Sequence, residues 1–163
     1  MRLLKHLCAR SARGLFPEDR LQRAAAAIAR DEARHRGEVC FAVESALGWR
    51  AVRAGCQARD RAAEVFSRLR VWDTAENNGI LIYLLLADRR IEILADRGLD
   101  GRISDEQWRG VCLLMEERLR AGDAEAAVLE GVAAAGDLLA GQFPRIDGRG
   151  DCNELPDRPQ VLD

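Results

Sequence analysis

The sequence predicts an α/β fold in which a small mixed sheet lies between layers of helices. Two observations lead to this prediction. Segments with helical periodicity alternate with segments of strand-like pattern, in the order α-β-α-β-β-α-α. The chain has 163 residues, of which 48% are apolar and 32% charged, so it suits one globular domain. We divide it into an N-terminal basic extension (1–16), an αβα domain (17–143) and an extended C-terminal tail (144–163).

The first half of the domain begins with a helix at Pro17, a residue that suits the first helical turn, and this helix stops at Gly37. Residues 38–46 then alternate between apolar side chains on two faces, which indicates a strand. Gly48 ends this strand, and we place Trp49 in a linker.

A helix over residues 57–70 leads to the longest apolar run of the chain, which we predict to be a strand over 80–87. A strand, a helix and a strand in this order imply a parallel pair with a right-handed crossover. The turn at 88–90 is too short for another crossover, so the next strand, 91–95, is predicted to be antiparallel.

Two further helices close the domain. Ser104 and Gln107 have the spacing of a capping box at the start of the first, which ends at Gly122. Asp123 is placed to cap the second. The tail from Pro144 has little periodicity, and its last apolar residues are candidates for contacts with the domain.

Composition excludes several classes of protein. The formal net charge of −2 provides no basic surface for nucleic acid. The five cysteines are scattered without a C-x-x-C pair and there are only two histidines, which argues against a zinc site of the Cys/His kind. Reduced thiols indicate a cytoplasmic protein. We find no secretory signal, and no apolar run approaches the length of a membrane span.

The N-terminus carries four basic residues and no acidic one between residues 1 and 17. Its leucines, Leu3, Leu4 and Leu7, fall on one face of a short amphipathic helix. We expect this helix to pack on its own domain in a monomeric protein. Contact with a membrane surface or a protein partner is the alternative.

Two acidic loops flank the predicted hairpin, at 72–79 and 96–104. The first precedes one strand and the second follows its antiparallel neighbour, so both loops belong at the same edge of the sheet. The candidate ligands for a divalent cation are therefore the carboxylates and amide oxygens gathered there and at the following helix start: Asp73, Glu76, Asn77, Asn78, Asp96, Asp100 and Asp105.

Calcium suits such a set of oxygen atoms best, and magnesium is the second choice. The alternative is structural, with each residue capping a turn or facing solvent. A third interpretation treats Gly98, Gly101 and Ser104 as an anion cradle beside Arg97 and Arg102. A bridging metal would then remove the conflict between a phosphate and the carboxylates.

These residues resemble the TPM domain family, whose name refers to thylakoid-lumen, photosystem-repair and receptor-modulating members. The resemblance extends from about Glu38 to Phe143. It is carried by the following segments: Asn77-Asn78-Gly79-Ile80-Leu81-Ile82, Asp88-Arg89-Arg90, the Gly98 loop with Asp105, and Gly122-Asp123 followed by Gly131. The ending from Asn153 to Pro159 resembles a soluble bacterial branch without signal peptide or anchor.

The resemblance implies a Rossmann-like three-layer αβα sandwich that binds a divalent ion, calcium in particular, near the acidic loops. A metal-dependent acid phosphatase with Asp73, Asp96 and Asp100 as ligands is the alternative function. The chain departs from the family pattern at Asn77, where many relatives have aspartate, and at Asp96, where they have glycine. Ala124 and Ala127 also replace an aromatic residue and a glycine.

Overall fold

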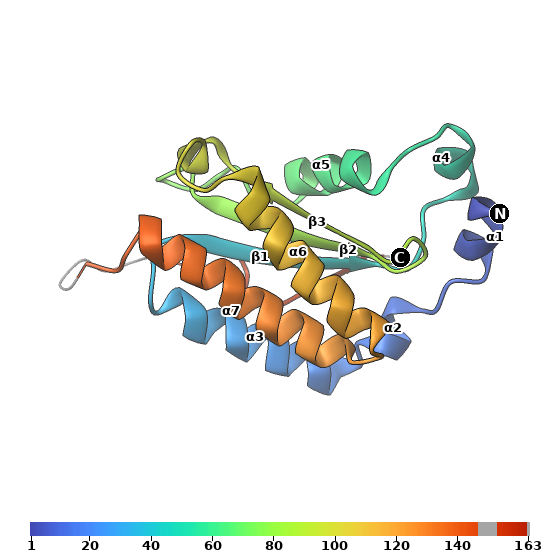
Figure 1. Cartoon of the computed structure of the whole chain (residues 1–163), viewed down its shortest axis with the longest axis horizontal. Helices are drawn as coiled ribbons and strands as arrows, with labels where there is room; N and C mark the ends of the chain where they lie inside the picture. Colours follow the sequence, from blue (N-terminus) through green and yellow to red (C-terminus); the bar gives the residue numbers. More distant parts are fainter. Residues whose placement is uncertain (147–152, 163) are drawn as a thin grey trace.

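A computed structural model describes residues 1–146 and 153–162 of the chain (Figure 1). The helices and strands follow the predicted order, and the expected short N-terminal helix is present. Additional short elements follow this helix and the first and third strands, and another lies near residue 160. In chain order they are α1 (Arg2–Leu7), α2 (Ala12–Leu15), α3 (Glu18–Glu32), β1 (Glu38–Glu44), α4 (Trp49–Arg53), α5 (Ala58–Arg68), β2 (Gly79–Leu85), β3 (Arg90–Ala95), the 3₁₀ helix η1 (Arg97–Leu99), α6 (Asp105–Arg120), α7 (Ala124–Gln142) and β4 (Gln160–Leu162).

The sheet is mixed and has the strand order β3-β2-β1-β4. β1 pairs in parallel with β2, with Glu38 opposite Gly79, and β2 pairs antiparallel with β3, with Ile80 opposite Ala95. The parallel pair and the tight hairpin predicted from the sequence are both confirmed. The acidic loop that leads into β2 and the acidic loop that follows β3 therefore lie at the same edge of the sheet.

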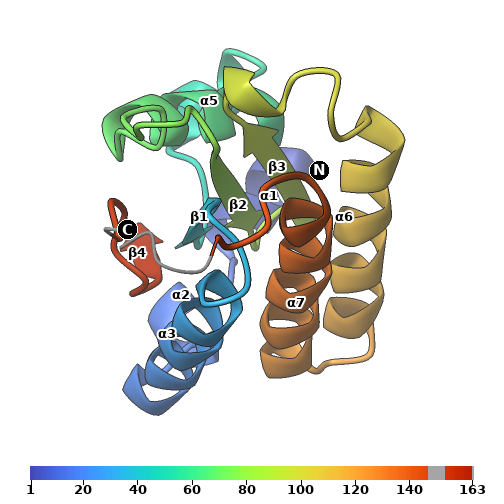
Figure 2. The ribbon, with the colours of Figure 1, turned by 90° about the vertical axis from the view of Figure 1, so that its left-hand side faces the viewer.

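Side chains of β1 alternate between two apolar clusters, one on each face of the sheet. Val39, Phe41 and Val43 join the core under α3, α6 and α7. Cys40 and Ala42 join a second core with residues of α5 and of the C-terminal segment. Figure 2 shows α5 on one side of the strands and α3, α6 and α7 on the other. The three-layer αβα sandwich is confirmed.

The predicted caps of the last two helices are present. The Ser104 hydroxyl accepts from the Gln107 amide at 3.3 Å, and the Gln107 side chain accepts from the Ser104 amide at 2.9 Å. Asp123 accepts from the Ala126 amide at 2.9 Å. These bonds satisfy backbone N–H groups that have no partner within the helix, and so fix where α6 and α7 begin.

The longest described helix, α7, lies against α6 and α3 (Figure 2). Gly131 permits the close approach to α6, because a Cβ atom there would lie 2.4 Å from the Met115 sulfur. Within residues 1–146 and 153–162, no helix combines the length and the apolar character needed to cross a membrane.

The linker prediction for Trp49 is wrong, because Trp49 begins the short helix α4. The tail, which we predicted to be extended, also contains a strand of the sheet. Gln160–Leu162 form β4, which pairs in parallel with β1 at residues 42–44. Leu155 and Leu162 are buried in the second core. A three-residue strand carries too short a pattern to be distinguished in a sequence from an irregular tail.

The N-terminal helix α1 packs on the domain through His6 rather than through its leucines. His6 is buried, and its Nδ1 accepts from the Leu47 amide at 3.0 Å. Its Nε2 lies 3.2 Å from Asp88, which also accepts from Arg2 at 2.7 Å. Leu4 and Leu7 remain 64% and 68% exposed. The expected packing on the domain is confirmed, but of the three leucines on the expected apolar face only Leu3 is partly buried.

Candidate functional site

The two acidic loops meet at one edge of the sheet, at the left-hand end of the molecule in Figure 1. The Gly98 amide donates to the Asn77 carbonyl oxygen at 2.8 Å. Arg97 Nε donates to the Asn77 side-chain oxygen at 3.0 Å. The convergence predicted from the hairpin is therefore present, and backbone as well as side-chain bonds maintain it.

Particular residue types make this close meeting of the loops possible. Asn77 has a φ of 52°, a left-handed conformation that asparagine tolerates better than most residues. A Cβ atom on Gly98 would lie 2.5 Å from the carbonyl oxygens of both Glu76 and Asn77. A Cβ atom on Gly79 would lie 2.2 Å from the Val71 carbonyl oxygen. The glycines therefore allow backbone-to-backbone contact on both sides of the first loop.

Two of the seven candidate ligands are buried, and each has an oxygen atom without a partner. Asn78 is 1% exposed and donates to the Arg36 carbonyl oxygen at 2.6 Å, but its Oδ1 has no hydrogen bond within the described residues. Asp96 is 9% exposed, and its Oδ1 accepts from the Arg97 amide at 2.8 Å. Its Oδ2 is buried without a partner in the same described part of the chain. An unpartnered buried oxygen is costly, so each of these atoms requires an explanation.

Two of the exposed acids are paired with arginines instead. Arg70 donates to Asp73 at 2.6 Å, and Arg36 forms an ion pair with Glu76. Both acids are candidate ligands from the sequence, and their arginine partners are not predicted there. Arg70 lies three residues before Asp73, a spacing that is visible in the sequence. Arg36 lies in the segment between α3 and β1, and only the fold brings it near Glu76.

Asp100 and Asp105 form a separate group. Both are exposed and line a hollow of about 390 Å³ beside β3, with Arg59 and Arg109 also in its lining. The seven candidates therefore form three groups. Asp73, Glu76 and Asn77 are paired with arginines, Asn78 and Asp96 are buried, and Asp100 and Asp105 line the hollow. Within residues 1–146 and 153–162, no three histidine, cysteine, aspartate or glutamate side chains gather closely enough to hold a metal ion.

The buried group fits a hard cation better than the exposed acids do. Carboxylate and amide oxygens are the donors that calcium takes in proteins. Asp96 Oδ2 and Asn78 Oδ1 are donors of this kind with no competing hydrogen bond among the described residues. Asp73, Glu76 and Asn77 would first have to release their arginines. The buried donor set thus contains one carboxylate, that of Asp96.

The model of the TPM domain family matches residues 10–138, which is most of the chain. This chain belongs to the TPM domain family. The resemblance carried by the Asn77-Asn78-Gly79 segment and the Gly98 loop is thereby confirmed. None of the curated proteins matches the chain.

Solved structures with the same fold include two bacterial proteins. The BA42 protein of the psychrophilic bacterium Bizionia argentinensis, solved by NMR, is 26% identical with a TM-score of 0.77, over 88% of this chain and 93% of that one. The N-terminal domain of a P. gingivalis protein, also solved by NMR, is 20% identical with a TM-score of 0.65, over 82% of each chain. The second likeness concerns the fold alone.

Proposed function

We propose that this TPM domain protein binds a divalent cation, calcium in preference to magnesium, at the edge formed by loops 72–79 and 96–104. One observation supports the proposal most directly. Two buried oxygens, Asp96 Oδ2 and Asn78 Oδ1, have no hydrogen-bond partner among the described residues, and both belong to the loops that Gly98 joins. A cation would compensate the buried charge of Asp96.

The charge balance of the edge limits the affinity. Asp73 and Glu76 are paired with Arg70 and Arg36, and Arg97 donates to Asn77. The affinity of calcium sites rises with the number of carboxylate ligands and with the rigidity of the site. With Asp96 as the main negative charge, we expect a dissociation constant of about 10⁻⁴ to 10⁻³ M. Water would complete the coordination shell.

A calcium titration followed through the backbone amide chemical shifts tests the proposal. We expect the shifts to be concentrated at 77–79 and 96–98, and magnesium to produce smaller ones. Asp96→Asn keeps the shape of the side chain and removes its charge, so it should weaken calcium binding by about tenfold or more. Asp137→Asn is the matched control, since Asp137 is an exposed carboxylate on α7 that pairs with Arg34.

The outcome that overturns the proposal is an absence of shifts at these loops at several millimolar calcium. Equal weakening by Asp96→Asn and Asp137→Asn would also overturn it, because binding would then depend only on net charge. The same proteins can be assayed with p-nitrophenyl phosphate. Hydrolysis that needs the cation and disappears in Asp96→Asn would assign phosphate-ester chemistry to this edge.

A further inference from the structure

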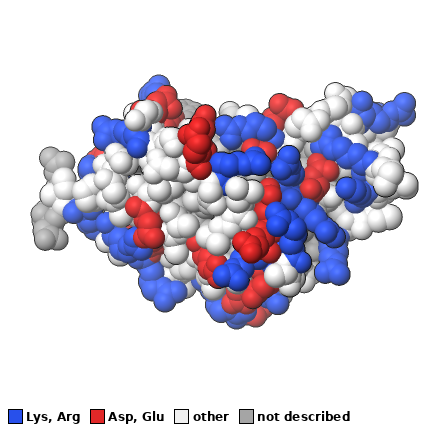
Figure 3. All heavy atoms as spheres, viewed as in Figure 1, with Lys and Arg blue, Asp and Glu red and all other residues white. Residues whose placement is uncertain are grey.

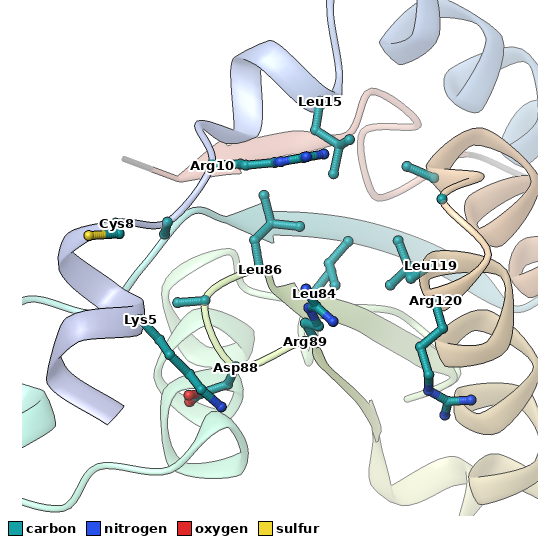
Figure 4. Close-up of a pocket in the computed structure, with 14 residues that line it drawn as sticks. Lys5, Cys8, Arg10, Leu15, Leu84, Leu86, Asp88, Arg89, Leu119 and Arg120 are labelled. Carbon is teal, nitrogen blue, oxygen red and sulfur yellow. The ribbon is translucent and has the colours of Figure 1, made fainter. Parts of the chain in front are cut away.

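A second hollow lies at the opposite end of the sheet from the acidic loops. Its volume is about 700 Å³, within the range of ordinary ligand sites. The linker between α1 and α2, the turn between β2 and β3, and the end of α6 surround it (Figure 4). Leu84 and Leu86 place it at the carboxyl end of β2, and ligands of open α/β sheets bind outside the carboxyl ends of the strands.

The floor of this hollow is aliphatic. Leu84 comes from β2, and Leu86 follows it in the turn (Figure 4). Leu15, Leu86 and Leu119 are only partly buried although they pack against the main core. No aromatic side chain is among the described residues that line the hollow, so it lacks a ring on which a nucleobase would stack. The floor therefore suits an aliphatic group.

The floor is also held in place before any ligand arrives. The Leu86 amide donates to the Glu44 carbonyl oxygen at 3.0 Å, and the Ala87 amide donates to the Ser45 carbonyl oxygen at 3.0 Å. These bonds continue the pairing of β1 and β2 into the turn. The Arg89 amide then closes the turn on the Leu86 carbonyl oxygen at 3.1 Å. A preformed floor lowers the ordering cost of binding.

The rim is basic. Lys5, Arg10, Arg89 and Arg120 line it, and Figure 4 shows Arg10 extended from the α1–α2 linker toward Leu15. Figure 3 shows many Lys and Arg side chains and fewer acids toward the right-hand end of the molecule. Arg120 lies 3.5 Å from Glu116 on its own helix. Lys5, Arg10 and Arg89 have no ion pair with any other described residue, and all three are exposed.

Among the described residues that line the hollow, Asp88 is the one acid, and its charge is already paired. Asp88 accepts from Arg2 at 2.7 Å and lies 3.2 Å from His6 Nε2. Burial alone would raise the pKa of Asp88, but the hydrogen bond and charge of Arg2, together with His6, outweigh it and lower that pKa. Asp88 therefore stays ionised and paired, and the unpaired charge around the hollow is positive.

We propose that this hollow binds an anionic amphiphile, with its anionic head group at Lys5, Arg10 and Arg89 and its aliphatic chain over the leucines. The positive rim complements a phosphate or carboxylate head, since arginine and lysine both bind such groups. The partly exposed leucines complement the chain, whose burial removes their apolar surface from water. This proposal is independent of cation binding at the other edge.

Titration of the full chain with octyl phosphate below its micelle concentration, followed by amide chemical shifts, tests the proposal. We expect shifts at 86–89 and at Gly122. Octylammonium has the same chain with the opposite charge, and inorganic phosphate has the head alone, so both should bind at least about tenfold more weakly. Arg10→Glu with Arg89→Glu should weaken octyl phosphate binding to the same extent.

Arg68→Glu, an exposed charge reversal on α5, is the matched control and should leave the affinity unchanged. If the double variant does not fold, the single variants Arg10→Ala and Arg89→Ala are used to repeat the test. Binding to vesicles of phosphatidylglycerol and phosphatidylcholine is compared with binding to vesicles of phosphatidylcholine alone. Binding to the anionic vesicles only would show that the head group can belong to a membrane lipid as well as to a free molecule. The proposal is overturned by an absence of shifts with octyl phosphate, by equal binding of octylammonium, or by equal weakening in Arg68→Glu.

Discussion

The amide of Gly98 donates to the carbonyl oxygen of Asn77 at 2.8 Å, and a Cβ atom on Gly98 would lie 2.5 Å from that same oxygen. One residue thus joins the loop after β3 to the loop before β2 and leaves no space for a side chain between them. The acidic edge depends on this contact, because Asp96 and Asn78 are brought to it by the two segments that the contact joins. The pair therefore offers a direct way to perturb the edge without changing a charge.

Gly98→Ala should separate the two loops and destabilise the fold. Because the obstructing atoms are backbone oxygens of Glu76 and Asn77, they cannot turn aside as a side chain would. We expect a loss of about 1–3 kcal/mol in the free energy of unfolding, measured with urea. Gly110→Ala in the exposed part of α6 has no neighbour within 4 Å and should raise stability by about 0.5–1 kcal/mol. Equal effects of the two changes would contradict the proposed contact.

Leu162→Ala should destabilise the protein although its strand, β4, has only three residues. Leu162 is buried in the core shared with α5, and its strand pairs with β1. Removing a buried leucine side chain costs about 2–5 kcal/mol, and the short strand β4, of three residues, favours the low end of that range. Urea unfolding measures the loss. Ile146→Ala is the control because Ile146 is 45% exposed, and the prediction fails if the two variants are equally stable.

Asp88→Asn should loosen the N-terminal helix. The carboxylate of Asp88 accepts from Arg2 and lies against His6, and both partners belong to α1. The pKa of Asp88 is lower in the folded state than in the unfolded state. The contribution of its carboxylate to stability is therefore complete above the unfolded-state pKa and is lost as the pH falls through the folded-state pKa. We expect faster amide hydrogen exchange at residues 2–7 in the variant at neutral pH. Leu4→Ala, at a residue that is 64% exposed, should leave that exchange unchanged. Unchanged protection in Asp88→Asn would show that α1 docks by other contacts.

The sheet and its flanking helices could be predicted because their patterns are local. The alternation along β1 separates Val39 and Phe41 from Cys40 and Ala42, and the structure places these pairs in two different cores. The capping box of Ser104 and Gln107 is likewise encoded within four residues. Such signals depend only on neighbouring residues in the sequence.

The partners of the loop acids could not be predicted in the same way. The sequence offers Glu76 as a candidate cation ligand, but in the fold Arg36 reaches it across forty positions of the chain. The strand β4 was missed for a related reason, since its pairing with residues 42–44 depends on where the chain returns after α7. The hollow above Leu86 is likewise formed by segments from residues 5–15, 84–89 and 119–124, which no local pattern connects.

Stability should fall as the pH rises from about 5 to 8 because of Glu32. Burial raises the pKa of this carboxyl to about 8, and the charges of Glu38 and Asp157 add to the rise, while the hydrogen bond from the Val39 amide opposes it. Between the ordinary pKa near 4.5 and the raised value, the folded chain retains a proton that the unfolded chain has released. The unfolding free energy therefore decreases through this interval, by an amount of the order of a few kcal/mol.

Glu32→Gln removes the titration and keeps an oxygen that can accept from the Val39 amide at the position of Glu32 Oε1. The variant should therefore match the natural protein near pH 5 and exceed its stability near pH 8, as measured by urea unfolding across this interval. Glu117→Gln, at an exposed position of α6, serves as the control and should retain the original slope. If Glu32→Gln loses stability as steeply as the natural protein, the pH dependence belongs to another group. If the unfolding free energy of Glu32→Gln stays constant across this pH interval while that of Glu117→Gln falls, the retained proton belongs to the carboxyl of Glu32.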